Sequence, residues 1–139
     1  QKLAEMTGAE VIDTISKAEP IGPKRLLDCL VIAPCTGNTL SKLALGITDT
    51  PVLMAAKAQL RNGRPLVIGI ATNDGLSGSA RNIATLLARK NVYFVPYGQD
   101  DPKNKPTSLV ARMCDTERTV EEALAGKQVQ PLLVEKWKD

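Results

Sequence analysis

Histidine is absent from the 139-residue sequence, and aromatic residues make up only 3% of it. Without histidine, Ser-His-Asp and Cys-His mechanisms, histidine-bound zinc and the most common general base are all excluded. The scarcity of aromatic rings leaves few surfaces on which single-stranded nucleic acid would stack. Any chemistry must therefore come from carboxylates, lysines, amides, hydroxyls or a bound cofactor.

Cysteine is also scarce: Cys29, Cys35 and Cys114 are the only three, and none is spaced as CxxC. An odd number of isolated cysteines does not predict a disulfide framework, whereas reduced thiols are typical of the cytoplasm. No apolar run is long enough to span a bilayer, and the chain does not open on a signal-peptide pattern. We therefore expect a soluble, cytoplasmic protein.

Charge of neither sign dominates, because 18 lysines and arginines face 15 acidic residues and give a net charge of +3. The densest basic stretches, residues 24–25 and 103–105, hold only two positive charges each. A protein that binds nucleic acid or a membrane surface normally concentrates such charge on one face. With 43% hydrophobic residues, a chain of this length suits one domain with its own core.

Three short apolar runs indicate buried strands. They cover residues 27–34, 66–71 and 92–96, and each adjoins or ends in a proline. Nearly continuous apolar strands are typical of parallel sheets that are covered on both faces. Helical patterns lie between them, so the order predicts an α/β fold with a parallel sheet and right-handed crossovers. Three core strands make a thin sheet, which an upstream segment would extend or oligomer contacts would cover.

Helices are expected over residues 1–6, 10–17, 40–47, 79–89 and 116–125. A further helix is expected to begin at an N-cap, Asp49, with Pro51 just inside it, and to end at Arg61. Residues 98–106 are predicted to form a surface loop, residues 108–113 a short edge strand and residues 129–134 an extended end. Because the chain begins at Gln1 without a methionine, we expect that an upstream segment is missing.

Two polar loops follow the first two expected strands. Residues 34–39 read Pro-Cys-Thr-Gly-Asn-Thr, and residues 72–79 read Thr-Asn-Asp-Gly-Leu-Ser-Gly-Ser. The carboxyl ends of parallel strands lie at one edge of a sheet, where the ligands of α/β folds bind. Hydroxyls, amides and a helix N-terminus at this edge suit an anionic or polar ligand. Turns are rich in the same residues, so ordinary strand-to-helix connections remain an equal alternative.

Several single residues near these loops allow two interpretations. Cys35 precedes a helix, which lowers a thiol pKa, but without a histidine base a packed small residue is the favoured interpretation. Lys42, one helical turn beyond the first loop, is either a solvated lysine or a partner for a ligand anion. Asp100 and Asp101 are favoured as turn residues over a cation site, and no metal site is predicted.

Residues 28–44 resemble the Pro-x-Ser/Thr-x-Asn-Thr segment of the flavoprotein family, here carried by Pro34, Thr36, Asn38 and Thr39. That family includes the flavin-dependent cysteine decarboxylases and phosphopantothenoylcysteine decarboxylase. The chain resembles more closely still one component of a two-component enzyme of spore-forming bacteria. This closer resemblance is carried by residues 48–58, 70–74 and 96–102 and by the pairs at 105–106 and 130–131. The resemblance extends over essentially the whole chain.

The resemblance implies a flavodoxin-like or Rossmann-like three-layer sandwich. One domain would span residues 1–139, and the family's first strand and phosphate loop would lie upstream of Gln1. It also implies an oxidoreductase component that works with an NADP-binding partner subunit to form dipicolinate (pyridine-2,6-dicarboxylate) from a dihydrodipicolinate-type precursor during sporulation. The implied cofactor is FMN, the compartment is the cytoplasm of the mother cell, and the assembly is a homo-oligomer of three or more chains.

The resemblance also assigns site residues. The cofactor site takes in Pro34, Cys35, Thr36, Gly37, Asn38, Thr39, Thr72 and Asn73. The substrate site takes in Asn38 and Asn73, with Lys42 and Arg81 as the cations that would face two carboxylates. Amides and hydroxyls suit both a flavin edge and a substrate carboxylate.

The sequence departs from the family's decarboxylases in two places. Their histidine upstream of the motif falls at Pro20, and their Met-rich clamp after the loop asparagine is replaced by Asp74 and Gly75. Oxidative decarboxylation of a cysteine is therefore not expected. Two alternatives stay open, namely a non-catalytic partner protein without flavin and a flavin-dependent decarboxylase of another acid.

Overall fold

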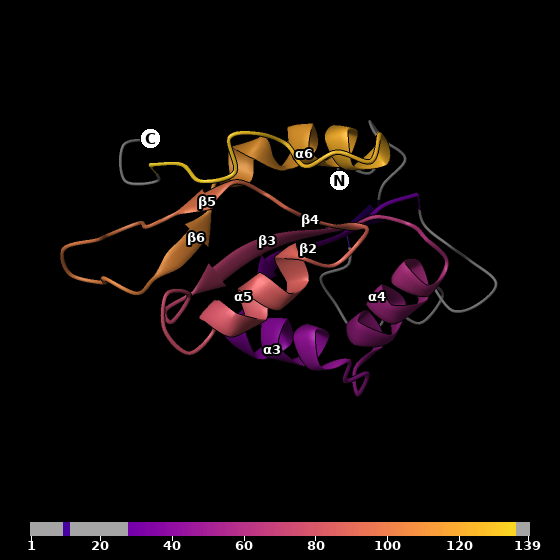
Figure 1. Ribbon diagram of the computed structural model, residues 1–139, viewed down its shortest axis with the longest axis horizontal. Helices are drawn as coiled ribbons and strands as arrows, with labels where there is room; N and C mark the ends of the chain where they lie inside the picture. Colours follow the sequence, from indigo (N-terminus) through magenta and orange to yellow (C-terminus); the bar gives the residue numbers. More distant parts are fainter. Residues whose placement is uncertain (1–9, 12–27, 136–139) are drawn as a thin grey trace.

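The centre of the sheet is formed by β2 (Leu30–Cys35) and β3 (Leu66–Thr72), which run parallel to each other. A computed structural model describes residues 10–11 and 28–135 of the chain (Figure 1). β1 (Glu10–Val11) pairs in parallel with β2, and β4 (Val92–Phe94) pairs in parallel with β3. Most side chains of the two central strands are buried, as their apolar runs predict for strands covered on both faces.

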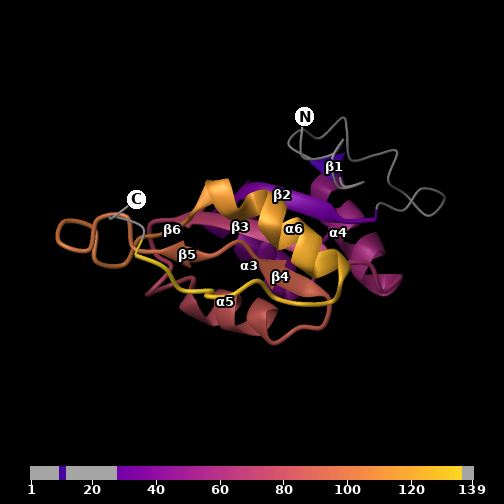
Figure 2. The ribbon, with the colours of Figure 1, turned by 90° about the horizontal axis from the view of Figure 1, so that it is seen from above.

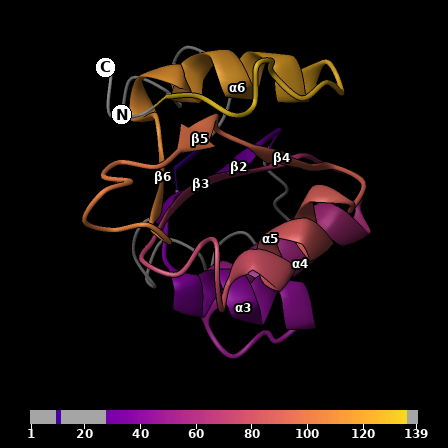
Figure 3. The same ribbon diagram turned by 60° about the vertical axis from the view of Figure 1, so that its left-hand side comes forward.

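Helices cover both faces of this sheet (Figure 3). α3 (Gly37–Leu45), α4 (Pro51–Arg61) and α5 (Ala80–Leu87) lie on one face, and α6 (Thr116–Leu124) lies on the other. The largest fully buried side chains of the core include Phe94, Leu30, Leu66, Ile68 and Leu86. Complete burial of a side chain of this kind contributes about 1.5–3 kcal/mol. The expected α/β three-layer sandwich is confirmed.

Within the described residues, two short antiparallel strands, β5 (Tyr97–Gly98) and β6 (Leu109–Ala111), bring the sheet to six strands. β3 pairs with β4 along its first half and with β6 near its carboxyl end. β6 in turn pairs with β5, so it lies between β3 and β5. The sheet is therefore wider than the three core strands and one edge strand predicted. A strand within residues 108–113 is confirmed by β6, but its predicted place at the edge is wrong, because an apolar pattern does not reveal which strand lies between two others.

Several element boundaries differ from expectation. Glu10 and Val11 form a strand rather than the start of a helix, while residues 12–17 and the helix expected over 1–6 lie outside the described residues. α4 is capped by Thr50 rather than Asp49, because the Thr50 hydroxyl accepts a hydrogen bond from the Leu53 N–H at 3.3 Å. A 3-10 turn, Met113–Asp115, joins β6 to α6.

The connection from β5 to β6 projects from the sheet as a structured loop (Figure 2). Within it, the Asp101 carboxylate accepts hydrogen bonds from the backbone and side-chain nitrogens of Asn104, both at 3.2 Å. Asp101 is thus a turn residue. The extended end pairs beside β5, where the Tyr97 N–H donates to the Leu132 carbonyl at 3.0 Å. No helix in residues 28–135 is long and apolar enough to cross a membrane.

Candidate ligand site

The first polar loop leads from an irregular strand end directly into a helix. The register between β2 and β3 shifts just before Cys35, and the exposed Pro34, which follows a cis peptide bond, has no N–H to give to the ladder. The Thr36 hydroxyl then caps α3 by accepting from the Thr39 N–H at 3.4 Å. α3 therefore begins at Gly37 and not near Leu40, and residues 37–39 form its first turn.

The second loop is organised around the carboxylate of Asp74. Its Oδ1 accepts a short hydrogen bond from the Thr72 hydroxyl and one of 2.8 Å from the Ser79 hydroxyl. The backbone N–H groups of Ser77 and Ser79 donate to the Asp74 carbonyl at 3.0 and 2.9 Å. The hydrogen bonds from Thr72 and then Ser79 lower the pKa of Asp74, so this carboxylate is ionised at neutral pH.

The two loops meet at Gly37. A methyl group on Gly37 would lie 2.9 Å from the Thr72 hydroxyl, 3.3 Å from the Ser79 hydroxyl and 3.4 Å from Asp74 Oδ1. These approaches leave no room for a larger residue at the start of α3. The expectation that both loops lie at one edge of the sheet is therefore confirmed.

The β5–β6 hairpin holds the second loop from the other side. The Thr107 hydroxyl donates to the Asn73 carbonyl at 2.7 Å, and the Leu76 N–H donates to the Thr107 carbonyl at 3.0 Å. Leu109 lies so close to Gly75 that a methyl group there would be 2.6 Å from its Cδ1. Backbone position around Asn73 is thus fixed by contacts that come from more than thirty residues further along the chain.

Two side-chain amides are available at this edge. Asn38, in the first turn of α3, and Asn73, in the second loop, are both exposed. Neither side-chain amide forms a hydrogen bond with any other residue in the described part of the chain. Exposed Thr36 and Pro34 lie on the same loop as Asn38. This donor and acceptor set fits the polar edge of a flavin ring, since an amide both donates and accepts.

Cys35 is fully buried, and its burial raises the thiol pKa to about 12. A protonated thiol in the core is a poor nucleophile, which supports the packed-residue interpretation. A ligand at the first loop can reach only the backbone of Cys35. Cys29 is buried in the same core, with a pKa likewise raised to about 12 by burial and by the nearby Asp28 charge.

The two predicted cations lie in different places. Lys42 belongs to the last turn of α3, where its ammonium pairs with Asp49 Oδ2 at 3.0 Å. Lys42 lies five positions beyond Gly37, about 7.5 Å along the helix axis. Arg81 is exposed in the first turn of α5, immediately after the second loop. The structure therefore places Arg81 near the junction of the loops, whereas Lys42 is directed to the far end of α3.

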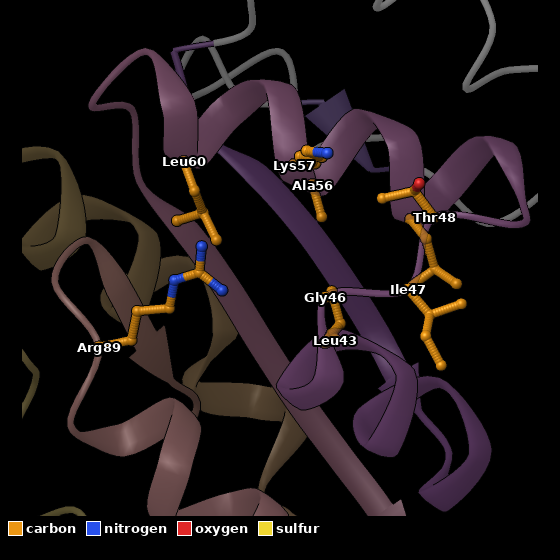
Figure 4. A pocket seen from close by; sticks show the side chains of 9 residues that line it. Leu43, Gly46, Ile47, Thr48, Ala56, Lys57, Leu60 and Arg89 are labelled. Atoms are coloured by element: carbon orange, nitrogen blue, oxygen red, sulfur yellow. The ribbon is translucent and has the colours of Figure 1, made fainter.

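A pocket of about 90 Å³ lies elsewhere, between the end of α3, α4 and the end of α5 (Figure 4). Its lining is mainly apolar but includes Lys57 and Arg89, and Figure 4 shows the Arg89 side chain extending beside Leu60. Ligand sites for drug-sized molecules are about 300–1,000 Å³. This pocket is too small for a flavin and is separate from the two polar loops.

The residues that organise the site are not apparent from the sequence alone. Asp74 stands out there only as a departure from a family pattern, although Thr72-x-Asp74 followed by Ser79 is a local signal for a hydrogen-bonded turn. Thr107 gives no such signal, because its partner Asn73 is distant in the sequence.

Comparison with known proteins agrees with this architecture. The chain matches the family model described as Flavoprotein over residues 1–122. It is 56% identical over 137 residues to the B subunit of dipicolinate synthase from Bacillus subtilis, a match that covers 99% of this chain and 68% of that protein. The crystal structure of the B subunit of dipicolinate synthase from Bacillus halodurans has a TM-score of 0.85 and 56% identity, covering 97% of this chain and 69% of that one.

A structure of PPC decarboxylase has a TM-score of 0.54 and 24% identity, covering 68% of this chain and 53% of that one, a likeness that shows the fold alone. The family resemblance drawn from residues 28–44 is confirmed by the family match and by the relatives aligned along nearly the whole chain. This chain belongs to the flavoprotein family.

Proposed function

We propose that this chain is the B-type component of a dipicolinate synthase. It works with an NADP-binding partner subunit, the A-type component, to form dipicolinate from a dihydrodipicolinate-type precursor during sporulation. The observation that carries the proposal is the 56% identity to a dipicolinate synthase component along 99% of the chain. The proposed setting is the cytoplasm of the mother cell, and the proposed assembly is a homo-oligomer of three or more chains together with the A-type component.

The reaction fixes what a cofactor must supply. Conversion of a dihydropyridine ring to a pyridine ring removes one hydride equivalent and one proton. Side chains do not accept hydride, so the acceptor is a cofactor, either the NADP⁺ of the A-type component or an FMN at the two-loop edge. Membership of the flavoprotein family supports a flavin on this chain.

The residues at this edge have separable roles in the proposal. Asn38, Asn73 and the Thr36 hydroxyl would hold the polar edges of the flavin or the substrate, because they are exposed on two loops that meet at Gly37. The backbone of residues 34–37 and the Thr72 side chain would form the wall behind them. Arg81 would face a substrate carboxylate from the first turn of α5.

Reconstitution tests the proposal. The A-type component with NADP⁺ and the precursor is expected to form dipicolinate only when this chain is added, and added FMN is expected to raise the rate. Asn38→Ala should lower the rate by about tenfold, the effect of losing one or two hydrogen bonds. Asn62→Ala, at the end of α4 and the opposite edge of the sheet, is the matched control and should leave it unchanged. Full activity of the A-type component without this chain would contradict the proposal.

The second candidate is a non-catalytic partner that shapes the complex while the A-type component carries out the redox step. The complete lack of histidine and the burial of Cys29 and Cys35 favour it. It requires that this chain be needed for activity, that FMN have no effect, and that Asn38→Ala be silent. The same reconstitution therefore separates the two candidates.

A further inference from the structure

Charge in this chain is separated by face, although the net charge is small. α3, α4 and α5 contain lysine and arginine but no aspartate or glutamate, and Arg89 and Lys90 follow the end of α5. On the opposite face of the sheet, α6 carries Glu117, Glu121 and Glu122 against one arginine (Figure 3). The cationic face of one copy of the chain and the acidic helix of another copy are therefore complementary in charge.

The pocket of about 90 Å³ lies on the cationic face. Its lining includes the buried side chains of Leu43 and Leu53, and Figure 4 shows Lys57 and Arg89 beside it. Neither cation forms an ion pair with any acidic residue in the described part of the chain. A cavity of about 150 Å³ accommodates benzene. This smaller pocket therefore suits a short aliphatic side chain that is flanked by carboxylates.

α6 presents a side chain of this kind. Glu117, Glu121 and Leu124 are spaced by four and then three positions, so they lie along one stripe of the helix. All three are exposed, Leu124 over 42% of its surface. Neither glutamate forms an ion pair within residues 28–135, and the neighbouring Arg118 is paired with Asp115 at 3.5 Å. The stripe is thus an apolar anchor beside two uncompensated carboxylates.

We propose that Leu124 of one copy enters the pocket of a second copy, where Glu117 and Glu121 face Lys57 and Arg89. This inference rests on the homo-oligomer of the proposed function and names the two surfaces that hold it together. Leu124 ends α6, so the negative end of the helix dipole also points toward the two cations. An apolar side chain in a pocket with charges around it is the usual arrangement of an interface hot spot.

The positions of the two surfaces determine the symmetry of the assembly. The pocket and the α6 stripe lie on opposite faces of the sheet, so the contact joins unlike surfaces (Figure 3). A two-fold dimer through either surface would place like charges against each other. Contacts between unlike surfaces satisfy every copy only when they close into a ring. The inferred contact therefore produces a closed ring of copies.

Sedimentation velocity of the full chain over a range of concentrations tests the contact. The wild type is expected to form larger species as its concentration rises, and to dissociate as added salt screens the charges. Leu124→Ser removes the anchor at an exposed position and should raise the Kd of self-association by about tenfold, the effect of exposing one leucine side chain.

Charge reversal on each surface supplies a second test. The cation variant combines Lys57→Glu with Arg89→Glu, and the acid variant combines Glu117→Lys with Glu121→Lys. Each variant alone should associate at least about tenfold more weakly than the wild type, because its two surfaces now repel each other. A mixture of the two variants should associate again, since each then offers the charge that the other lacks. Recovery on mixing also shows that both variants are folded.

The matched control combines Lys103→Glu with Lys105→Glu in the exposed β5–β6 loop, and should associate as the wild type does. Leu124→Ser and charge variants that all associate like the wild type would overturn the inference alone. The same result with loss of binding to the A-type component would assign the cationic face to that partner instead. A wild type that stays monomeric would overturn the inference and the homo-oligomer of the proposed function, whereas dipicolinate formation by the reconstituted complex is measured separately.

Discussion

The contact between the two loops predicts an unusual cost for Gly37→Ala. Alanine normally stabilises a helix relative to glycine by up to about 1 kcal/mol. Here its methyl group would lie 2.9 Å from the Thr72 hydroxyl, which is buried and must shift by a few tenths of an ångström. That shift weakens the hydrogen bond from Thr72 to Asp74, and a complete loss of such a bond to a charged group costs about 1.5–3 kcal/mol.

The balance is a net destabilisation of about 1 kcal/mol, equivalent to a fall in Tm of about 3–5 °C for a domain of this size. Urea unfolding of a double-mutant cycle measures it. In a Thr72→Ala background the obstructing hydroxyl is gone, so Gly37→Ala should become neutral or slightly stabilising, with a coupling of about 1 kcal/mol. The reasoning is refuted if Gly37→Ala stabilises the protein equally in both backgrounds.

Three further outcomes are expected. Gly75→Ala should lower the free energy of unfolding in urea by an amount at the upper end of about 1–3 kcal/mol, because its methyl group would lie 2.8 Å from the Cβ of Leu109, which cannot rotate away. A change below about 0.5 kcal/mol would contradict the close packing of loop and hairpin. A thiol reagent at about pH 8 should modify exposed Cys114 rapidly, while the buried thiols of Cys29 and Cys35, with pKa values of about 12, react only after unfolding. Rapid reaction of all three thiols in the native protein would be inconsistent with the burial of Cys29 and Cys35. The pKa of Asp74 is lowered in the folded protein, so its stabilising contribution is present above the ordinary pKa of 3.8 and is lost as the pH falls through the folded pKa. Asp74→Asn should therefore destabilise the protein at neutral pH and lose that effect in acid. An equal difference in the free energy of unfolding at both pH values would argue against an ionised Asp74.

Local signals in the sequence are sufficient to predict the layered architecture. The runs at residues 27–34 and 66–71 are mostly apolar without alternation, a composition that is typical of strands covered on both faces. The same signals place two polar loops at the ends of neighbouring parallel strands, and the topology then brings those loops together. Element class and the positions of the two polar loops at the strand ends follow from physics that acts over a few residues.

Contacts between distant segments cannot be predicted from such local signals. Nothing in the short run at residues 109–111 indicates that it enters the sheet beside β3, and nothing in Thr107 indicates that it holds the Asn73 backbone. The spacing of Lys42 from the first loop allows it to face a ligand, but Asp49 offers an oppositely charged partner at 3.0 Å. Side-chain choices of this kind depend on neighbours that the fold supplies.

The most direct test of a ligand site at the two-loop edge is the visible absorption of the purified full chain after FMN is added and the protein is desalted. We expect retained bands at about 370 and 450 nm, the absorption of an oxidised flavin cofactor. Asn38→Ala, a helical position where alanine does not harm folding, should retain markedly less flavin, while Asn62→Ala should match the wild type. A wild-type protein that stays colourless, or an Asn38→Ala variant that retains as much FMN as the wild type, would contradict it.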